Sequence, residues 1–168
     1  MRPASVRREM IREGVGFPRY TRRFLAVGIM AVGPGTSPFA LEVEREFAAA
    51  HAILLGGVRE RLHGHNWRVV VSVAGDRLDQ EELLCDFHAV EGMVDALVAP
   101  FRDANLNETA PFDRINPTAE AVARHVADGL ASALAAAMPA VHVEWVRVTE
   151  APRCTAVVRM PRPGGGQP

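Results

Sequence analysis

The sequence of 168 residues contains no lysine and only two cysteines, Cys85 and Cys154. Without lysine, no side-chain amine can form a Schiff base with a carbonyl substrate, so this class of covalent catalysis is excluded. Two cysteines cannot make the disulfide framework of a small secreted domain. No apolar run reaches the roughly 20 residues of a membrane-spanning helix, so we expect no membrane partner. The length instead suits one domain with a single hydrophobic core.

Charge is balanced overall but uneven along the chain. Residues 1–38 carry seven arginines and two acids, whereas residues 39–168 carry twelve arginines and eighteen acids. A basic arm alone is weak support for nucleic-acid binding, and we expect no such partner. The segment "TRRFLAVGIMAVG" resembles a short or twin-arginine export signal, but no clear small-x-small cleavage site follows it. We therefore favour an unstructured extension or an early start, with Met30 as the natural start, and a cytoplasmic location.

Hydrophobic periodicity predicts six elements between a disordered tail at 161–168 and the N-terminal extension. In chain order these are strands at 39–53 and 61–74, helices at 87–99 and 117–138, and strands at 141–150 and 154–160. We expect Asp86 to cap the first helix and Asn116 the second, with Pro117 at its first position. The order predicts an α+β fold, ββααββ, with an antiparallel four-stranded sheet and two helices on one face.

Three histidines continue the apolar faces of the first two predicted strands. His51 lies at the end of the first strand, and His63 and His65 begin the second, with Gly64 between them. If the strands form a hairpin, the three imidazoles converge, and three neutral imidazoles suit Zn²⁺ with a fourth position left open for catalysis. Gly64 is expected to allow a close backbone approach. The alternative is three unrelated strand histidines.

Several short motifs then occur in one order: "FAAAH", "LHGHNWRVVV", "DF" at a helix start, "LNE", "NPTAE" and "VRVTEAP". Together they resemble the 6-pyruvoyl-tetrahydropterin synthase and 6-carboxy-tetrahydropterin synthase family over about residues 39–160. The resemblance implies the tunnelling fold (T-fold), whose subunits join their sheets into a barrel, and a homohexamer of two trimers. It also implies a zinc-dependent lyase for 7,8-dihydroneopterin triphosphate or a related pterin, with a role such as queuosine biosynthesis. The loop between His51 and His63 is a few residues short for the family.

The resemblance also assigns roles to individual residues. It implies that His51, His63 and His65 bind zinc. Glu150 matches the glutamate that anchors the amino-pyrimidine edge of the pterin, where a carboxylate accepts two charge-assisted hydrogen bonds. Thr118 falls where the family also contacts the pterin. The alternatives are a surface acid at a strand end for Glu150 and a helix-start residue for Thr118.

The family's proton-transfer residues are absent from their usual places. Arg59 occupies the position of the cysteine, and Asp103 and Arg102 occupy those of the histidine and its aspartate. We expect Glu60, beside Arg59, or Asp103, oriented by Arg102, to replace them, with Cys154 on the last hairpin as a third candidate. A metal-polarised substrate hydroxyl needs a weaker base, so a carboxylate could serve. Each of the three has the alternative of a solvated loop or core residue.

Two classes of function follow from this combination. The first is a zinc enzyme that catalyses the family reaction, an aldolase-like cleavage, or a cyclisation or dehydration in a specialised pathway. The second is a non-catalytic relative that binds zinc and a pterin-like ligand. An open metal position favours the enzyme, whereas the missing proton-transfer groups favour a binder or a new substrate. Four other residues are expected only to pack or to lie at the surface: Cys85, His88, His125 and His142.

Overall fold

The computed structural model describes residues 36–163, so most of the predicted extension and most of the predicted tail lie outside the described residues. The long elements are β1 (Phe39–His51), β4 (His63–Gly75), α1 (Phe87–Val98), α2 (Ala119–Ala137), β6 (Val141–Ala151) and β7 (Cys154–Arg159). The short ones are strands β2 (Leu54–Leu55), β3 (Val58–Arg59) and β5 (Ala104–Asn105), and 3₁₀ turns at Ala99–Phe101 and Leu106–Glu108. No helix in the described range is long and apolar enough to cross a membrane.

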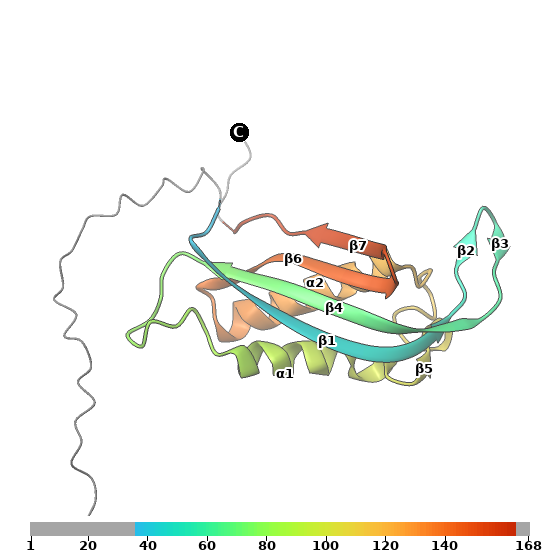
Figure 1. The fold of residues 1–168 in the computed structure, drawn as a ribbon, viewed down its shortest axis with the longest axis horizontal. Helices are drawn as coiled ribbons and strands as arrows, with labels where there is room; N and C mark the ends of the chain where they lie inside the picture. Colours follow the sequence, from blue (N-terminus) through green and yellow to red (C-terminus); the bar gives the residue numbers. More distant parts are fainter. Residues whose placement is uncertain (1–35, 164–168) are drawn as a thin grey trace, which may run out of the picture. The chain divides into compact units, whose positions relative to one another are not determined.

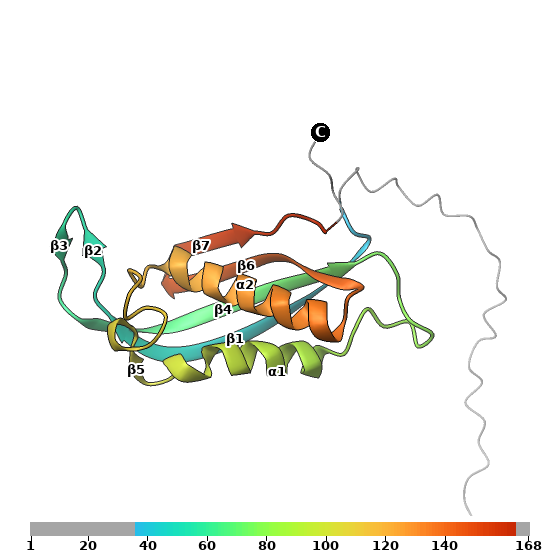
Figure 2. The ribbon, with the colours of Figure 1, turned by 180° about the vertical axis from the view of Figure 1, so that it is seen from behind.

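The sheet is mainly antiparallel, with the strand order β5-β1-β4-β6-β7. Both helices cover the same face of this sheet, and the β2–β3 hairpin projects beyond the end of β1 and β4 (Figures 1 and 2). The predicted α+β arrangement is therefore confirmed. The predicted sheet lacked β5 and the small hairpin, because strands of two residues leave no periodic signal in a sequence.

The β1–β4 ladder places the core side chains. Thirteen residues of each strand pair, and Phe47 lies opposite Trp67. Side chains alternate between the two faces of a strand, so one face of this pair packs beneath the helices while glutamates of β1 point away. Fully buried valines continue the apolar face along β4 and meet those of the helices: Val69, Val71, Val73, Val90, Val94, Val98, Val122 and Val126.

The predicted cap of α1 is confirmed, whereas the predicted cap of α2 is not. The Asp86 carboxylate accepts a hydrogen bond from the His88 N–H at 2.9 Å, as predicted for α1. The cap of α2 is Thr118, whose Oγ1 accepts from the Ala121 N–H at 3.2 Å, so the prediction of Asn116 was wrong. The side chain of Asn116 instead forms two hydrogen bonds with the backbone of Leu54.

A bulge changes the phase of β6. Ser72 of β4 pairs with Trp145, but the next pair is Val73 with Val143, so Glu144 is an extra residue. The buried valines therefore have odd numbers before the bulge, at Val141 and Val143, and even numbers after it, at Val146 and Val148. This shift brings Glu150, at the end of β6, onto the face that carries the core.

At the end of β4, the Asp76 carboxylate contacts residues from both termini of the described chain. The Ser37 hydroxyl donates to Asp76 Oδ1 at 3.0 Å, and the Arg162 guanidinium pairs with Asp76 Oδ2. The hydrogen bond from Ser37 and the nearby Arg162 together lower the pKa of Asp76. This cluster lies at the end of the sheet away from the β2–β3 hairpin.

Candidate metal centre

The three histidines meet at one corner of the sheet. His51 and His63 are direct cross-strand partners, and His65 pairs with Ala49 two residues further along the same ladder. The ring centroids lie 4.8 Å apart for His51 and His63, 5.2 Å for His51 and His65, and 4.7 Å for His63 and His65. The predicted convergence of the three imidazoles is confirmed.

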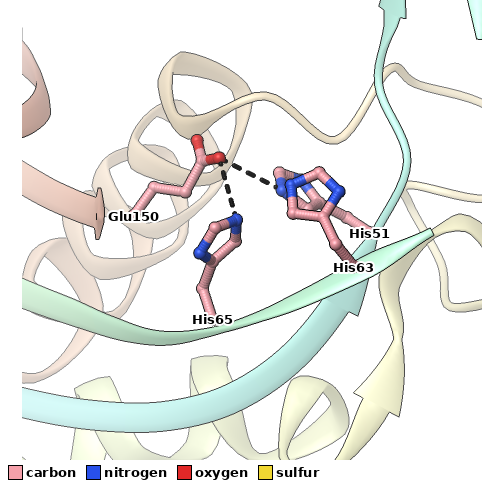
Figure 3. Close-up of side chains that lie close together, drawn as sticks. All are labelled: His51, His63, His65 and Glu150. Atoms are coloured by element: carbon pink, nitrogen blue, oxygen red, sulfur yellow. Dashed lines mark ion pairs between the residues drawn. The ribbon is translucent and has the colours of Figure 1, made fainter. Parts of the chain in front are cut away.

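Glu150 joins the histidines from the end of β6 (Figure 3). Its Oε1 lies 3.2 Å from Nε2 of His51 and 3.3 Å from Nε2 of His65. One ligand atom from each of the four residues lies within 4.8 Å of the other three. The described residues thus bring together a cluster of three nitrogen donors and one carboxylate oxygen.

Backbone carbonyls fix the orientation of two rings. Nδ1 of His51 lies 2.8 Å from the Pro117 carbonyl oxygen, and Nδ1 of His63 lies 2.8 Å from that of Arg61. A carbonyl oxygen only accepts, so we assign the proton of each neutral ring to Nδ1. Nε2 then keeps its lone pair and faces the cluster, as in metal-binding histidines whose other nitrogen is held by an outer partner.

Two nitrogens of the cluster are buried without a hydrogen bond: Nε2 of His51 and Nε2 of His65. Both lie at ion-pair distance from Glu150, yet neither contact has the angles of a hydrogen bond. A buried polar atom without a partner is costly, and a cation among the four residues accounts for both nitrogens. Three imidazoles and a carboxylate form a donor set typical of Zn²⁺, so the residues present fit this metal.

The floor of the cluster is apolar. The Trp67 ring lies 4.8 Å from that of His51 and stacks on Phe47 at 6.0 Å, and its Nε1 donates to the Ala49 carbonyl at 3.2 Å. Removal from water lowers the pKa of His65, although the nearby Glu150 carboxylate acts in the opposite direction. Burial therefore favours the neutral imidazole, which is the form that binds a metal.

Comparison with known proteins identifies this arrangement. The family model described as 6-pyruvoyl tetrahydropterin synthase matches residues 40–161. The chain belongs to this family. The 6-carboxy-5,6,7,8-tetrahydropterin synthase of Bacillus subtilis (strain 168) is 31% identical over 136 residues, covering 76% of this chain and 90% of that protein.

Solved structures of the 6-pyruvoyl tetrahydropterin synthase family show the same fold. The enzyme from Caenorhabditis elegans matches with a TM-score of 0.63 and 19% identity, covering 73% of this chain and 95% of that chain. The enzyme from Plasmodium vivax matches with a TM-score of 0.58 and 18% identity, covering 74% of this chain and 99% of that chain. The predicted tunnelling fold is confirmed.

Two asparagines that the sequence did not reveal as site residues hold the segment that follows His51. Asn107 Oδ1 accepts from the Ala52 N–H at 2.7 Å, and its Nδ2 donates to the Ala52 carbonyl at 2.9 Å. Asn116 makes the same pair of bonds with Leu54, at 2.7 and 3.0 Å. Both asparagines lie in the motifs "LNE" and "NPTAE", which were the only signal of their importance.

The "NPTAE" motif of this family member has a local structural explanation. Asn116 binds the backbone of Leu54, the Pro117 carbonyl orients His51, and Thr118 caps α2. Three consecutive residues thus link the histidine cluster to the helix that covers the core. A contact between Thr118 and a pterin stays a prediction.

The three candidate catalytic residues lie outside the four-residue cluster. Oε1 of Glu60 lies 3.7 Å from Nδ1 of His63, and this oxygen also accepts from the Ile53 N–H at 3.1 Å. Asp103 is exposed and has a positive φ of 56°. Cys154 is exposed at the start of β7.

The arginines at the positions of the missing family residues have partners of their own. Arg59 Nη1 donates to the Ala52 carbonyl at 3.0 Å. Arg102 Nη2 donates to Asp95 at 2.7 Å, a different carboxylate from the predicted Asp103. Arg59 also lines a cavity of about 500 Å³ that borders the centre, together with Ala52, Asn107, Arg114 and Pro117. Both guanidiniums therefore have structural roles in this chain.

The structure also places Gly64, the first cysteine and two further histidines. A Cβ at Gly64 would lie 3.8 Å from the Ala49 carbonyl oxygen, an ordinary contact, so the predicted close backbone approach was wrong. Cys85 packs against the core as expected, and burial raises its thiol pKa. His88 is exposed beside Asp86, and His125 lies between Phe101 and Phe112.

Proposed function

We propose that this protein is a zinc-dependent lyase for 7,8-dihydroneopterin triphosphate or a related pterin. The observation that carries the proposal is the pair of buried, unpartnered Nε2 atoms of His51 and His65 beside His63. When bound there, Zn²⁺ would supply a Lewis acid for the oxygens of the substrate side chain. The family relationship supports the pterin as the substrate class.

The residues around the cluster have distinct tasks in this proposal. His51, His63 and His65 would hold the metal, and the apolar floor of Trp67 and Phe47 excludes water on one side. Glu150 would accept hydrogen bonds from the amino-pyrimidine edge, a charge-assisted recognition of paired N–H donors. Thr118 would contact the same ring.

Glu60 is the first candidate for the proton-transfer group. Its Oε1 lies 3.7 Å from Nδ1 of His63. An oriented carboxylate can take a proton next to a polarised oxygen, and proton loss there leads to elimination or carbon–carbon cleavage. Asp103 and Cys154 are alternative bases that a bound substrate would have to reach.

A product assay under matched zinc loading tests the proposal. We expect turnover to be slow beside an ordinary family member, because a positioned acid or base contributes about 10²–10⁴-fold. Glu60→Gln and Asp103→Asn should remove most of the residual activity, while zinc content stays unchanged. Cys154→Ala tests the third candidate in the same assay. Full family-level activity that none of these changes affects would show that the catalytic groups lie elsewhere.

A specific observation favours a second candidate, a non-catalytic zinc- and pterin-binding protein or a cyclase or dehydratase with a new substrate. Two of the three family positions hold arginines, Arg59 and Arg102, whose guanidiniums form structural hydrogen bonds. Arginine does not act as a proton relay near neutral pH. Tight pterin binding with no product would support the binder. Turnover of another pterin by the same centre would support the changed substrate.

We also propose that the protein assembles as a homohexamer, a dimer of trimers. Strand β7 leaves one edge of the described sheet unpaired, and most of β1 is unpaired on the other. The β2–β3 hairpin exposes three apolar side chains, with 47% of Leu54 and 71% of both Leu55 and Val58 accessible. Open edges and apolar surface are features that association covers. Light scattering that shows a monomer at micromolar concentration would contradict this assembly.

A further inference from the structure

We propose that Glu150 is a fourth protein ligand that closes the metal centre at rest and leaves the metal when a substrate binds. The inference rests on the proposed function for the identity of the metal and for the pterin as the incoming ligand. It changes the expected state of the resting centre, because three histidines alone would leave one position open.

The first step is that Glu150 lies where a metal ligand would lie. The bulge at Glu144 turns this side chain to the core face, where Oε1 lies almost equally far from two Nε2 atoms, at 3.2 and 3.3 Å. Those nitrogens have no hydrogen bond, so the carboxylate does not satisfy them as a partner. An anion placed at equal distances from two lone pairs is stable when a cation lies between them. Glu150 thus has the position of a ligand.

The second step is that this ligand is held less firmly than His51 and His63. The rings of His51 and His63 are each fixed by a backbone carbonyl. Within the described residues the Glu150 carboxylate makes no hydrogen bond and no ion pair other than those with His51 and His65. It also sits at a register irregularity between Thr149 and Ala151, and 24% of its side chain is accessible.

The third step identifies what can displace it. A carboxylate that leaves a cation needs compensating donors, and two parallel N–H groups supply them through both oxygens. The amino-pyrimidine edge of a pterin offers such a pair. Both oxygens are then occupied, so pterin recognition and metal ligation compete for Glu150. The centre opens a metal position only when the correct ring has been bound.

Cobalt substitution of the full-length protein tests this exchange. The probe is 2-amino-4-hydroxypteridine, which lacks the side-chain hydroxyls that could themselves reach the metal. We expect the probe to alter the visible absorption of the wild-type Co²⁺ protein. Glu150→Gln should show an altered spectrum from the start and no further change with the probe. Glu42→Gln, the same substitution at an exposed residue of β1, is the control and should respond like wild type.

Zinc affinity gives a second readout by competition with a chelator. Glu150→Gln should weaken zinc binding about 10-fold or more, the scale seen when support for a metal ligand is removed. Saturating probe should weaken zinc binding by wild type, because coupling between two ligands is reciprocal. The probe should leave zinc binding by Glu150→Gln unchanged.

The outcomes separate the exchange from the proposed function. Identical cobalt spectra for wild type and Glu150→Gln would show that Glu150 is not a ligand. An altered spectrum for Glu150→Gln, together with a probe that binds wild type without changing its spectrum, would overturn the displacement. A protein that binds cobalt but not the probe would overturn the pterin as the displacing ligand and as the substrate class. A protein that binds no metal would overturn the proposed function itself.

Discussion

The two ends of the β1–β4 pair share one ladder and one inward face, yet they are completed in different ways. At one end Val71 and Val73 are fully buried against side chains of the same chain. At the other end the Nε2 atoms of His51 and His65 are shielded from solvent but have no hydrogen-bond partner. The comparison shows that the valine end is finished by packing alone. The histidine end would be completed by the proposed metal, which is not part of the chain.

The largest effect should come from removing one ligand at the histidine end. His63→Ala should reduce the metal content from about one Zn²⁺ per chain to nearly none, because one imidazole of the donor set is lost. Elemental analysis of protein purified without chelators measures this content. His88→Ala, at an exposed histidine, should retain the metal. Equal zinc in both variants would show that the three rings are not the site.

A substitution at the valine end should affect the stability of the fold and not the zinc content. Val71→Ala should lower the free energy of unfolding by about 2 kcal/mol, since two buried methyl groups and their contacts are lost. Its zinc content should remain at the wild-type level. Urea unfolding in the presence of a chelator gives the stability without a contribution from the metal. A marked loss of zinc would mean that the two ends are coupled through the strands.

A smaller effect should come from the asparagine that holds the chain after His51. Asn107→Ala leaves the N–H and carbonyl of Ala52 without these side-chain partners, and such a loss costs about 1–3 kcal/mol. Zinc affinity should fall about 10–100-fold, because the position of a ligand depends on this outer contact. Asn66→Ala, on the outward face of β4, is the matched control. Unchanged affinity would show that the β1–β4 ladder alone positions His51.

The smallest expected effect concerns a partly buried histidine that is not part of the cluster. Burial lowers the pKa of His125, so the unfolded chain takes up this proton more readily than the folded one. The stability due to the neutral ring is therefore present above the unfolded pKa of about 6.5 and is lost as the pH falls through the folded pKa. Wild type should lose more stability than His125→Gln between pH 7.5 and 5.5. His88→Gln should behave as wild type.

The sequence predicts the histidine cluster because it depends on local alternation. Period two in β1 and β4 places His51 and His65 on the core face, and the short connection makes the strands neighbours. Glu150 could be assigned only by resemblance, since its face depends on one extra residue in β6. The phase change between Val143 and Val146 marks that bulge in the sequence, but its meaning requires the pairing with β4.

The asparagine contacts were not predictable for a different reason. Asn107 and Asn116 bind backbone groups more than fifty residues away, and no local pattern encodes such a pairing. The cap of α2 was misplaced by two residues because asparagine and threonine both cap helices well. Tertiary contacts then decided between them, since the side chain of Asn116 was already bound to Leu54.

Because His51 pairs directly with His63, changes in the loop between them can be separated from changes in the positions of these two rings. The eleven residues from 52 to 62 leave the sheet and return between these two ligands, and their tip at Gly56 and Gly57 has no neighbour within 4 Å of an added Cβ. The tip of this loop can be lengthened, shortened or exchanged while the ladder keeps both imidazoles in register. The histidine corner can therefore stay unchanged while the tip of the hairpin diversifies beside it, which makes this tip the natural place to graft new substrate selectivity.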